Sequence, residues 1–424
     1  MAGKLAALQK FLQSRSLVKD CTVLPPTFPR EDVAAYCGFD PTAASLHLGH
    51  LVTLNALAAA AAHNIRPIAL IGGGTALIGD PSGKSAARPK LEMDLVRANS
   101  VAIQQQIAAI FPRLLAKAAA QTSASLLFVN NFDIYKDLSL LDWLRNVGFL
   151  FPIRPLLAKD MVQARAEGLT YTEFSYQLLQ AYDFAWLHRH HHCVLQIGGS
   201  DQWGNITTGT ELIRKGSGAT ACGLTLPLIT TETGEKFGKS EGNALFLDPS
   251  LTSPYHIFQY CYNLPDNSIS TLLRRLTFTP EEEITALCQA SPDLRKPQIA
   301  LGSALLSVIH SQEMAQTAVR LSELLFSRCY SQLSHKEIAL LKASITARYL
   351  KSADLNTDIV TILATLGTAD SKSAVKKLIS QKALRVNGEL VGSGDFKLEG
   401  KAVAERFFVV QSGKKHMELL ELRD

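Results

Sequence analysis

Residues 33–71 constrain the fold of this chain more than any other segment. An apolar run at 33–39 is followed by a turn at 40–42, a helical stretch at about 46–63, and a second apolar run at 67–71. This order predicts a strand, a crossover helix and a parallel strand, which together are the building block of a parallel β-sheet. We therefore expect an α/β protein.

The rest of the chain divides by its pattern of strands, helices and prolines. Strand-like runs at 126–129 and 194–197 alternate with helical periodicity, so residues 1–227 are predicted to form one doubly wound, Rossmann-like domain. Residues 228–330 are predicted to form a mainly helical domain, because prolines separate short helical segments there. A chain of 424 residues is in any case too long for a single core.

Composition narrows the class of protein. With 47% apolar and 19% charged residues the chain can bury large cores, which excludes a disordered protein. The longest uncharged stretches are too short and too polar to cross about 30 Å of hydrocarbon.

The first 20 residues are expected to form an amphipathic helix rather than an export signal. Seven cysteines without a C-x-x-C pair disfavour a disulfide framework and a four-thiolate zinc site. We expect a soluble, cytoplasmic protein.

Two short motifs point to a phosphate-rich ligand. The first is His47-Leu48-Gly49-His50, whose imidazoles would share one face of a helix near its N-terminus, where free N–H groups favour anions. The second is residues 234–242, Gly-Glu-Lys-Phe-Gly-Lys-Ser-Glu-Gly, which are expected to form a mobile basic loop. Such a loop can close on a polyphosphate and neutralise charge on a leaving group. Each motif alone also fits an ordinary exposed surface; the two together favour a site.

Two other nucleotide-binding patterns fail in this sequence. Residues 79–85 end like a P-loop, but Ile78 occupies the position of the first required glycine. After Gly72 and Gly74, Leu77 occupies the third glycine position of the dinucleotide-binding motif. The sequence therefore supports neither a P-loop nucleotide hydrolase nor a dehydrogenase.

The helix predicted at residues 172–188 carries a polar stripe on an otherwise apolar surface. At about 100° per residue, Tyr176, Gln180 and Asp183 lie within roughly 60° of one another. A helix that is apolar nearly all round is buried, so each of these polar groups costs about 1–3 kcal/mol if it lacks a hydrogen-bond partner. The partners are either a structural network or a small polar ligand.

The residues after the run at 194–197 offer further polar groups. Gly199, Asp201 and Gln202 follow the predicted strand at its carboxyl end, where parallel sheets bind ligands, and Asp201 is suited to accept hydrogen bonds from a ribose. Just before this strand, histidines at 188 and 190–192 precede Cys193 on an expected loop. Adjacent histidines on a loop rarely converge on one ion, so we predict no metal site.

These motifs, in this order, resemble the paired signatures of class I aminoacyl-tRNA synthetases. The segments Tyr-Cys-Gly-Phe-Asp-Pro-Thr at 36–42, Ile-Gly-Asp-Pro-Ser-Gly-Lys at 78–84, Gln-Ala-Tyr-Asp at 180–183 and Gly-Ser-Asp-Gln-Trp-Gly-Asn at 199–205 are similar to those of bacterial-type tyrosyl-tRNA synthetases. The resemblance extends over nearly the whole chain. Leu48 and the pair Phe237-Gly238 depart from the usual signature residues, but the charged positions are kept.

The resemblance implies a tyrosine–tRNA ligase, which forms tyrosyl-adenylate and pyrophosphate from tyrosine and ATP with Mg²⁺, and then transfers the tyrosyl group to the 3′ end of tRNA(Tyr). The residues implied to bind tyrosine are Tyr36 and Asp183 at its phenol hydroxyl and Asp80, Tyr176 and Gln180 at its ammonium. The residues implied to bind ATP are Gly38, Asp40, Thr42, His47, His50, Gly199, Asp201 and Gln202. The basic residues implied to close over the pyrophosphate are Lys84, Arg88, Lys236 and Lys239. No tightly bound cofactor is expected.

A linker is predicted at residues 331–354, and the α+β module that follows at 355–424 resembles the S4-type RNA-binding domain. A basic helix is predicted at 373–381, and the pair Asn387-Gly388 after it is a strong hairpin signal. The formal net charge of +5 is too small to indicate an RNA partner, so the local charge has to do so. The residues predicted to bind RNA are Lys376, Lys377, Lys382 and Arg385, with a merely solvated basic face as the alternative.

Two other functions remain as alternatives. A tryptophanyl enzyme would share the fold and the chemistry, but the pair Tyr36 and Asp183 suits a phenol. A synthetase-like RNA-binding protein without catalytic activity belongs to a different class, and the presence of both motif histidines and both loop lysines argues against it. The resemblance also implies a homodimer, formed through an apolar segment at 146–158 whose Phe149, Leu150, Phe151 and Ile153 are expected to be exposed.

Overall fold

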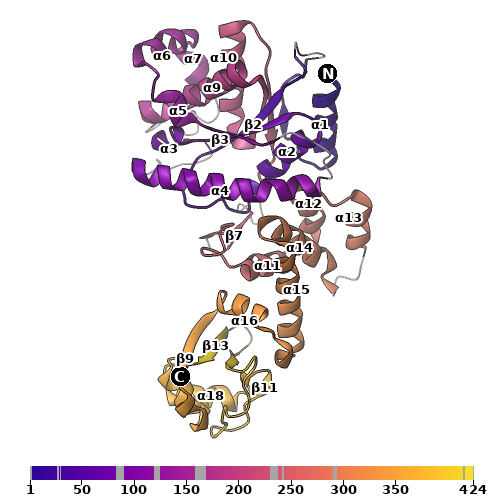
Figure 1. The fold of residues 1–424 in the computed structure, drawn as a ribbon, viewed down its shortest axis with the longest axis vertical. Helices are drawn as coiled ribbons and strands as arrows, with labels where there is room; N and C mark the ends of the chain where they lie inside the picture. Colours follow the sequence, from indigo (N-terminus) through magenta and orange to yellow (C-terminus); the bar gives the residue numbers. More distant parts are fainter. Residues whose placement is uncertain are drawn as a thin grey trace. The chain divides into compact units, whose positions relative to one another are not determined.

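The computed structural model describes residues 2–25, 28, 30–82, 90–118, 125–157, 169–229, 237–240, 243–289, 294–413 and 416–423. The chain forms two compact units (Figure 1). Unit 1 comprises Met1–Asp248 and Pro265–Pro297, and unit 2 comprises Pro249–Leu264 and Gln298–Asp424. The domain boundaries predicted from the sequence divide the chain by type of secondary structure instead, and they stay predictions.

The sheet of unit 1 has six strands and is mostly parallel. Its strands are β1 (Asp20–Cys21), β2 (Ala34–Phe39), β3 (Arg66–Ile71), β4 (Leu127–Asn130), β5 (Cys193–Gly199) and β6 (Cys222–Leu226). They lie in the order β1-β6-β5-β2-β3-β4, and only the short edge strand β1 is antiparallel to its neighbour. In the centre, Tyr36 of β2 lies opposite Ile68 of β3 and Gln196 of β5. The carboxyl ends of the parallel strands therefore meet at one edge of the sheet.

Helices cover both faces of this sheet (Figure 1). On one face α2 (His50–Ala62) packs with α4 (Met93–Lys117), and on the other α9 (Tyr171–His191) packs with α10 (Trp203–Ser217). Strand residues such as Ile68 and Leu70 are buried between these layers, which explains why the strands are nearly continuous apolar runs. The predicted doubly wound α/β architecture is confirmed.

Shorter elements complete unit 1. The helices are α1 (Ala2–Ser14), α3 (Thr75–Ile78), α5 (Asn131–Tyr135), α6 (Leu140–Asn146), α7 (Ile153–Leu157), α12 (Asp266–Leu276) and α13 (Glu281–Cys288), and a ribbon is formed by β7 (Lys239–Ser240) and β8 (Asn243–Ala244). The start of α9 is fixed by a capping box, in which Thr170 Oγ1 accepts from the N–H of Glu173 and the Glu173 carboxylate accepts from the N–H of Thr170. This cap determines which face of α9 each later residue occupies.

The helix predicted at about 46–63 was placed too early, because α2 begins only at His50. The preceding residues are extended beside residues 245–247: the N–H of Leu48 donates to the carbonyl of Leu245 (3.0 Å), and the N–H of Leu247 donates to the carbonyl of Leu46 (2.8 Å). Backbone groups that are paired in this way are not available for helical hydrogen bonds. Leu46 and Leu48 are buried, so the sequence pattern alone does not distinguish this extended segment from a helix.

Unit 2 consists of helices followed by a small sheet. Its helices are α11 (Pro254–Tyr262), most of α14 (Lys296–Ile309), α15 (Gln312–Ser327), α16 (His335–Lys342), α17 (Ile359–Thr365) and α18 (Lys372–Ser380). Its sheet has the order β11-β10-β12-β13-β9, with β9 (Thr346–Leu350), β10 (Leu384–Val386), β11 (Glu389–Leu390), β12 (Phe407–Ser412) and β13 (His416–Leu422). Buried side chains of Val375, Leu384 and Phe408 join α18 to this sheet. We refer to residues 343–423 as the C-terminal module.

Three further features bear on the class of protein. Among the described residues, no helix combines the length and the apolar character needed to cross a membrane. The seven cysteines are all described, and all are free thiols. The amphipathic N-terminal helix is α1, which buries Leu5, Leu8 and Leu12.

Candidate active site

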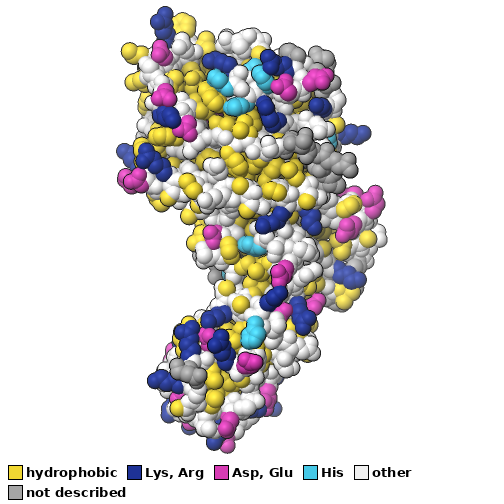
Figure 2. Space-filling model, viewed as in Figure 1, with side chains coloured by type: hydrophobic (Ala, Val, Ile, Leu, Met, Phe, Trp, Pro, Cys, Tyr) yellow, Lys and Arg dark blue, Asp and Glu magenta, His cyan; other side chains and the backbone are white. Residues whose placement is uncertain are grey.

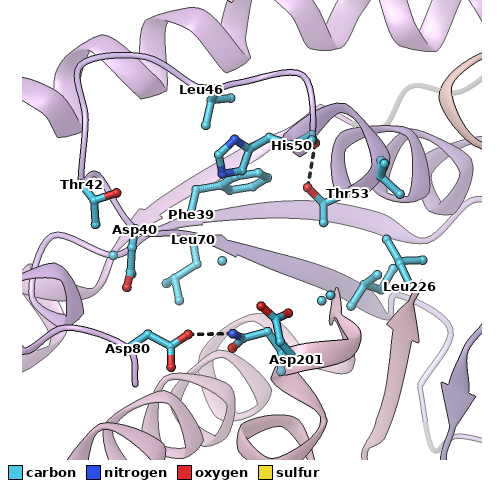
Figure 3. A pocket seen from close by; sticks show the side chains of 18 of the residues that line it. Phe39, Asp40, Thr42, Leu46, His50, Thr53, Leu70, Asp80, Asp201 and Leu226 are labelled. Carbon is cyan, nitrogen blue, oxygen red and sulfur yellow. Dashed lines mark hydrogen bonds between the residues drawn. The ribbon is translucent and has the colours of Figure 1, made fainter. Parts of the chain in front are cut away.

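A cavity of about 650 Å³ opens in unit 1 where the parallel strands end (Figure 3). The predicted site residues that line it are Tyr36, Gly38, Asp40, Thr42, His47, His50, Asp80, Tyr176, Gln180, Asp183, Gly199, Asp201 and Gln202. They come from the ends of β2 and β5, the entry to α2, the segment after α3, and the polar face of α9. The predicted residues Lys84, Arg88 and Lys236 lie outside the described residues, as does the side chain of Lys239.

One end of the cavity holds a buried carboxylate, that of Asp183 on α9, which is 1% exposed. Its Oδ1 accepts a hydrogen bond from Tyr135 Oη (2.5 Å), and its Oδ2 accepts one from Asn131 Nδ2 (3.0 Å). Burial raises the pKa of Asp183 to about 8; the bonds from Tyr135 and Asn131 act in the opposite direction, and the charge of Asp40 adds to the rise. The ionisation of this carboxyl group near neutral pH therefore depends on the hydrogen bonds that it receives.

Tyr36 on β2 lies at the same end of the cavity. It is fully buried, and its ring packs against Phe184 with the ring centroids 5.3 Å apart. Burial, and after it the nearby charge of Asp183, raises the pKa of Tyr36 well above its ordinary value, so the hydroxyl keeps its proton. Among the described residues this hydroxyl has no hydrogen-bond partner. An unpaired buried hydroxyl that faces a cavity is suited to bind a polar ligand atom.

A hydrogen-bond network connects this end of the cavity with its middle. Asn131 Nδ2, which donates to Asp183, also donates to Thr75 Oγ1 (2.9 Å), and Thr75 Oγ1 in turn donates to Asp40 Oδ1 (2.7 Å). Tyr176 Oη donates to the second oxygen of Asp40 (2.8 Å). The polar stripe of α9 thus has structural partners and also lines the cavity, so the two interpretations left open by the sequence are not exclusive.

Asp80 and Asp201 lie on the opposite side of the cavity from His50 (Figure 3). Gln202 Nε2 donates to Asp80 Oδ2 (2.7 Å), and Asn205 Nδ2 donates to Gln180 Oε1 (2.9 Å). The carboxylate of Asp201 comes from the same side in this view. Carboxylates grouped around one cavity favour an ammonium group and hydroxyl donors as ligands.

The two histidines of the His-Leu-Gly-His motif lie in contact, although only His50 belongs to the helix. Their ring centroids are 3.9 Å apart. Each Nδ1 accepts from the backbone, His50 from the N–H of His47 (3.1 Å) and His47 from the N–H of Gly49 (3.1 Å). The ring proton of each neutral imidazole must then be on Nε2, which makes that atom a donor. Burial, and after it the electrostatic effect of the neighbouring His47, lowers the pKa of His50 to about 3, so His50 donates as a neutral group.

The end of the glycine- and lysine-containing loop is attached directly to this motif. Phe237 is buried and donates its N–H to the carbonyl of Ile229 (2.8 Å), and Leu245 donates its N–H to the carbonyl of Gly238 (2.6 Å). Gly238 has φ +81°, and a Cβ on it would lie 3.0 Å from the Cβ of Leu48. Only glycine adopts this conformation easily at such a close approach. The two motifs that the sequence separates so widely therefore form one structural element.

Four residues that hold the site in place were not predicted from the sequence, namely Thr75, Asn131, Tyr135 and Asn205. Asn131 is fully buried, and its Oδ1 accepts from the N–H of Gly74 (2.7 Å) as well. One signal was available: Asn131 follows a predicted strand at its carboxyl end, where polar residues of parallel sheets meet ligands. Tyr135 offered no comparable signal.

The structure corrects two further expectations. The histidine cluster is not on a loop, because three of its histidines belong to the last turn of α9 and His192 is the left-handed C-cap of that helix. The expected exposed segment at 146–158 is only partly exposed: Phe149 is 86% and Ile153 is 64% exposed, but Phe151 is buried beside Trp143. Phe151 packs inward because a run of apolar residues in a short helical turn points in several directions.

The C-terminal module contains the predicted basic helix and hairpin. The helix is α18, and β10 and β11 pair antiparallel across Asn387 and Gly388, which both have positive φ (48° and 80°), as a two-residue hairpin turn requires. Among the described residues, Lys376, Lys377 and Lys382 are exposed and form no ion pair, whereas Arg385 donates to the carbonyl of Gly388 (3.0 Å). Figure 2 shows Lys and Arg side chains gathered on the side of this module where β9 lies.

The fold and the cavity together define a class I aminoacyl-tRNA synthetase. A family model described as tRNA synthetases class I (W and Y) matches residues 29–327. A second model, described as Tyrosine--tRNA ligase SYY-like C-terminal domain, matches residues 343–420. Membership of this class implies the use of ATP.

Similar proteins narrow the class to one amino acid. Tyrosine--tRNA ligase of Anaeromyxobacter dehalogenans is 38% identical over 98% of this chain and 99% of its own length, and that of Staphylococcus haemolyticus is 40% identical over 96% and 97%. The crystal structure of a C-terminally truncated mitochondrial tyrosyl-tRNA synthetase from Aspergillus nidulans has a TM-score of 0.69 and 27% identity, covering 77% of this chain and 97% of that one. The chain belongs to the tyrosine–tRNA ligase family.

Proposed function

We propose that the cavity of unit 1 joins L-tyrosine to the α-phosphate of ATP, and that the tyrosyl group then passes to tRNA(Tyr). In the first step the carboxylate of tyrosine attacks the α-phosphorus, a carboxyl–phosphate bond forms, and the bond to the departing pyrophosphate breaks. In the second step a ribose hydroxyl at the 3′ end of the tRNA attacks the tyrosyl carbonyl and releases AMP. Because the tyrosine carboxylate is already ionised, the first step needs no protein nucleophile or general base.

The observation that carries this proposal is the pairing of Tyr36 and Asp183 at one end of the cavity. A phenol hydroxyl placed there would donate to the Asp183 carboxylate and accept from the otherwise unpaired hydroxyl of Tyr36. Phenylalanine would leave both groups buried without this partner, at a cost of about 1–3 kcal/mol for each polar group. The pair therefore favours tyrosine over a substrate with an unsubstituted ring.

The other cavity residues suit the remaining parts of the two substrates. Asp80, Tyr176 and Gln180 would bind the ammonium of tyrosine, which the carboxylates around the cavity favour. The residues proposed to bind the ribose and α-phosphate of ATP are Gly38, Asp40, Thr42, Gly199, Asp201 and Gln202. The Nε2–H groups of His47 and His50 would donate to the phosphates. Donors held in place before the reaction stabilise the charge that develops on the departing pyrophosphate.

Mg²⁺ would accompany ATP in this proposal. Among the described residues, no group of three His, Cys, Asp or Glu side chains is arranged to hold a metal ion. Mg²⁺ in nucleotide sites is usually bound mainly by phosphates and water, with one or two carboxylates of the protein. The ion would neutralise phosphate charge; the protein residues named above would position the substrates.

The same proposal assigns tRNA binding to the C-terminal module and a dimer contact to unit 1. Exposed lysines that form no ion pair among the described residues suit a phosphodiester backbone, with Lys376 and Lys377 on α18 and Lys382 just after it as the contacts. A surface that a second copy of the chain covers is suggested by exposed apolar side chains on consecutive short helices, namely Leu140, Leu141, Phe149, Ile153 and Leu157.

We expect the enzyme to act in the cytoplasm, where its free thiols would stay reduced.

Exchange of labelled pyrophosphate into ATP tests the proposal without tRNA. With the purified full chain we expect exchange in the presence of tyrosine and none above background with tryptophan or phenylalanine. Exchange with tryptophan in place of tyrosine would overturn the assignment of Tyr36 and Asp183. Absence of exchange with all three would favour an RNA-binding protein without catalytic activity.

A further inference from the structure

Asp183 receives two hydrogen bonds from residues outside its own helix, one from the amide of Asn131 and one from the hydroxyl of Tyr135. Asn131 also bonds to Gly74 and Thr75, so it ties several segments together. Tyr135 on α5 contributes its hydroxyl, which contacts Asp183 Oδ1 (2.5 Å) and the carbonyl of Leu179 (3.1 Å).

We infer that Tyr135 is a positioning residue for tyrosine recognition: its hydroxyl holds one oxygen of Asp183, so that the carboxylate faces the substrate phenol in the ionised form. The inference rests on the proposed function, in which Asp183 accepts the phenol hydroxyl of tyrosine. Each carboxylate oxygen can accept two hydrogen bonds. With Tyr135 on one oxygen and Asn131 on the other, each oxygen keeps one acceptor position for the substrate.

The single proton of the Tyr135 hydroxyl has two possible acceptors, Asp183 and the carbonyl of Leu179. The hydrogen bond between Tyr135 and Asp183 is therefore sensitive to the protonation state of Asp183. When Asp183 is ionised, Tyr135 donates to it. When Asp183 is protonated, the carboxyl proton can be donated to Tyr135 Oη, while Tyr135 donates to the carbonyl of Leu179. A substrate phenol that donates its proton prefers the first arrangement, so tyrosine binding selects the ionised carboxylate.

The surroundings of Asp183 make its ionisation easy to change. The titratable groups that face it are Tyr36 on β2, Asp40 after β2, Tyr135 on α5 and Tyr176 on α9. Burial and the charge of Asp40 favour the neutral form of Asp183, with a pKa of about 8, whereas the bond from Tyr135 favours the ionised form. Loss of the Tyr135 hydroxyl therefore shifts Asp183 toward the neutral form. A neutral carboxyl group costs less to bury against the bare ring of phenylalanine, so discrimination falls as well.

Tyr135→Phe tests this inference, because it removes the hydroxyl and keeps the ring. Loss of one hydrogen bond to a charged group should raise the KM for tyrosine in pyrophosphate exchange at pH 7 about 10-fold, with kcat less affected. The pH at which kcat/KM for tyrosine reaches its plateau should move up by about one unit. The ratio of kcat/KM for tyrosine over phenylalanine should fall. Phenylalanine has the same amino and carboxyl groups as tyrosine, so its profile controls for ionisation of the substrate.

Two further variants make the outcomes distinct. Tyr182→Phe is the matched control: Tyr182 precedes Asp183 on α9 but is not among the described residues that line the cavity, so its profile should equal that of the unmodified enzyme. Asp183→Asn should raise the KM for tyrosine and remove the effect of Tyr135→Phe when the two are combined. An unchanged KM in Asp183→Asn would overturn the proposed role of Asp183. The role of Tyr135 alone would be overturned by a different result. In that case Asp183→Asn would raise the KM for tyrosine, but Tyr135→Phe would leave the KM, the pH profile and the selectivity for tyrosine over phenylalanine unchanged.

Discussion

His50 illustrates how burial decides what a single side chain can contribute. Its pKa is lowered to about 3 because the half-buried ring is largely shielded from water and lies beside a second imidazole. Protonation would place a positive charge there, which phosphates would favour, but the protein disfavours it before any ligand arrives. The structure therefore indicates a hydrogen-bond donor at this position rather than a cation.

The first prediction concerns this donor. His50→Gln places an amide N–H near the position of Nε2, whereas His50→Ala removes the donor. We expect kcat for pyrophosphate exchange to fall about 100-fold in His50→Ala and distinctly less in His50→Gln, as for other lost donors to developing charge. His50 is neutral at any pH well above its pKa. The dependence of kcat on pH between 6 and 7 should therefore be the same in the unmodified enzyme and in the glutamine variant. An ionisation in this range that only the unmodified enzyme shows would contradict a neutral His50.

Residues with a periodic or motif position were predictable from the sequence, and residues defined by a tertiary partner were not. Tyr176, Gln180 and Asp183 were recognised because a 3.6-residue period groups them on one helix face. Tyr135 meets Asp183 only because α5 packs on α9, and no pattern in its own segment records that contact. The roles of the cavity residues in binding stay predictions until kinetic data test them.

At the scale of elements, the carboxyl end of β3 is tightly packed against the residues that follow β2. A Cβ on Gly72 would lie 1.8 Å from Asp40 Oδ1 and 2.6 Å from Thr75 Oγ1. Asp40 cannot give way without losing its bonds from Thr75 and Tyr176. The absence of a side chain at this strand end therefore keeps the network in place.

The second prediction is that Gly72→Ala displaces Asp40. We expect the KM for ATP to rise at least 10-fold and the free energy of unfolding to fall by about 1–3 kcal/mol, as for other overpacked sites. Kinetics of pyrophosphate exchange and denaturant unfolding measure the two effects. Gly216→Ala on α10 is the control, because a Cβ there meets nothing within 4 Å. Equal behaviour of the two variants would show that Asp40 tolerates the shift.

Element boundaries were predicted less well than element types. The βαβ unit was recognised from its apolar runs, but the start of α2 was set four residues too early, at 46 instead of His50. The reason is that residues 245–247 supply the backbone partners of residues 46–48, and a local pattern does not contain this distant segment. The edge strand β1 was missed for a similar reason, since only its pairing with β6 makes it a strand.

At the scale of the whole molecule, the cavity and the helix proposed to bind tRNA belong to different units. The cavity lies within unit 1, and the basic helix α18 lies within unit 2. The third prediction follows: Lys376→Glu combined with Lys377→Glu should raise the KM for tRNA(Tyr) in aminoacylation more than 10-fold and reduce its dependence on salt, because each lost phosphate contact lowers the salt slope. Pyrophosphate exchange should be unchanged.

A matched control separates local contact from overall charge in that experiment. Lys10→Glu combined with Lys117→Glu makes the same change in net charge at two exposed lysines of unit 1, outside the C-terminal module. This control should aminoacylate tRNA like the unmodified enzyme. Equal losses in both double variants, or a parallel loss of exchange activity, would contradict binding by α18.

The fourth prediction concerns assembly. Phe149→Glu places a charge in the exposed apolar surface of unit 1 and should convert a dimer into a monomer, as measured by sedimentation equilibrium. Phe326→Glu on α15 is the matched control, because Phe149 is 86% and Phe326 is 85% exposed. If Phe149→Glu remains dimeric, or if the unmodified chain is a monomer, the proposed contact surface is wrong.

The pairing of residues 46–48 with residues 245–247 also bears on how the enzyme is made. Besides these bonds, the N–H of Asp248 donates to Ser45 Oγ (3.1 Å), so the segment that carries His47 is held from a distant part of the chain. On the ribosome, His47 emerges long before Leu247, and contacts between such distant segments form late. A nascent chain released before this point would have the sheet strands that flank the cavity but no fixed position for His47. Activity would therefore appear only when synthesis of unit 1 is nearly complete.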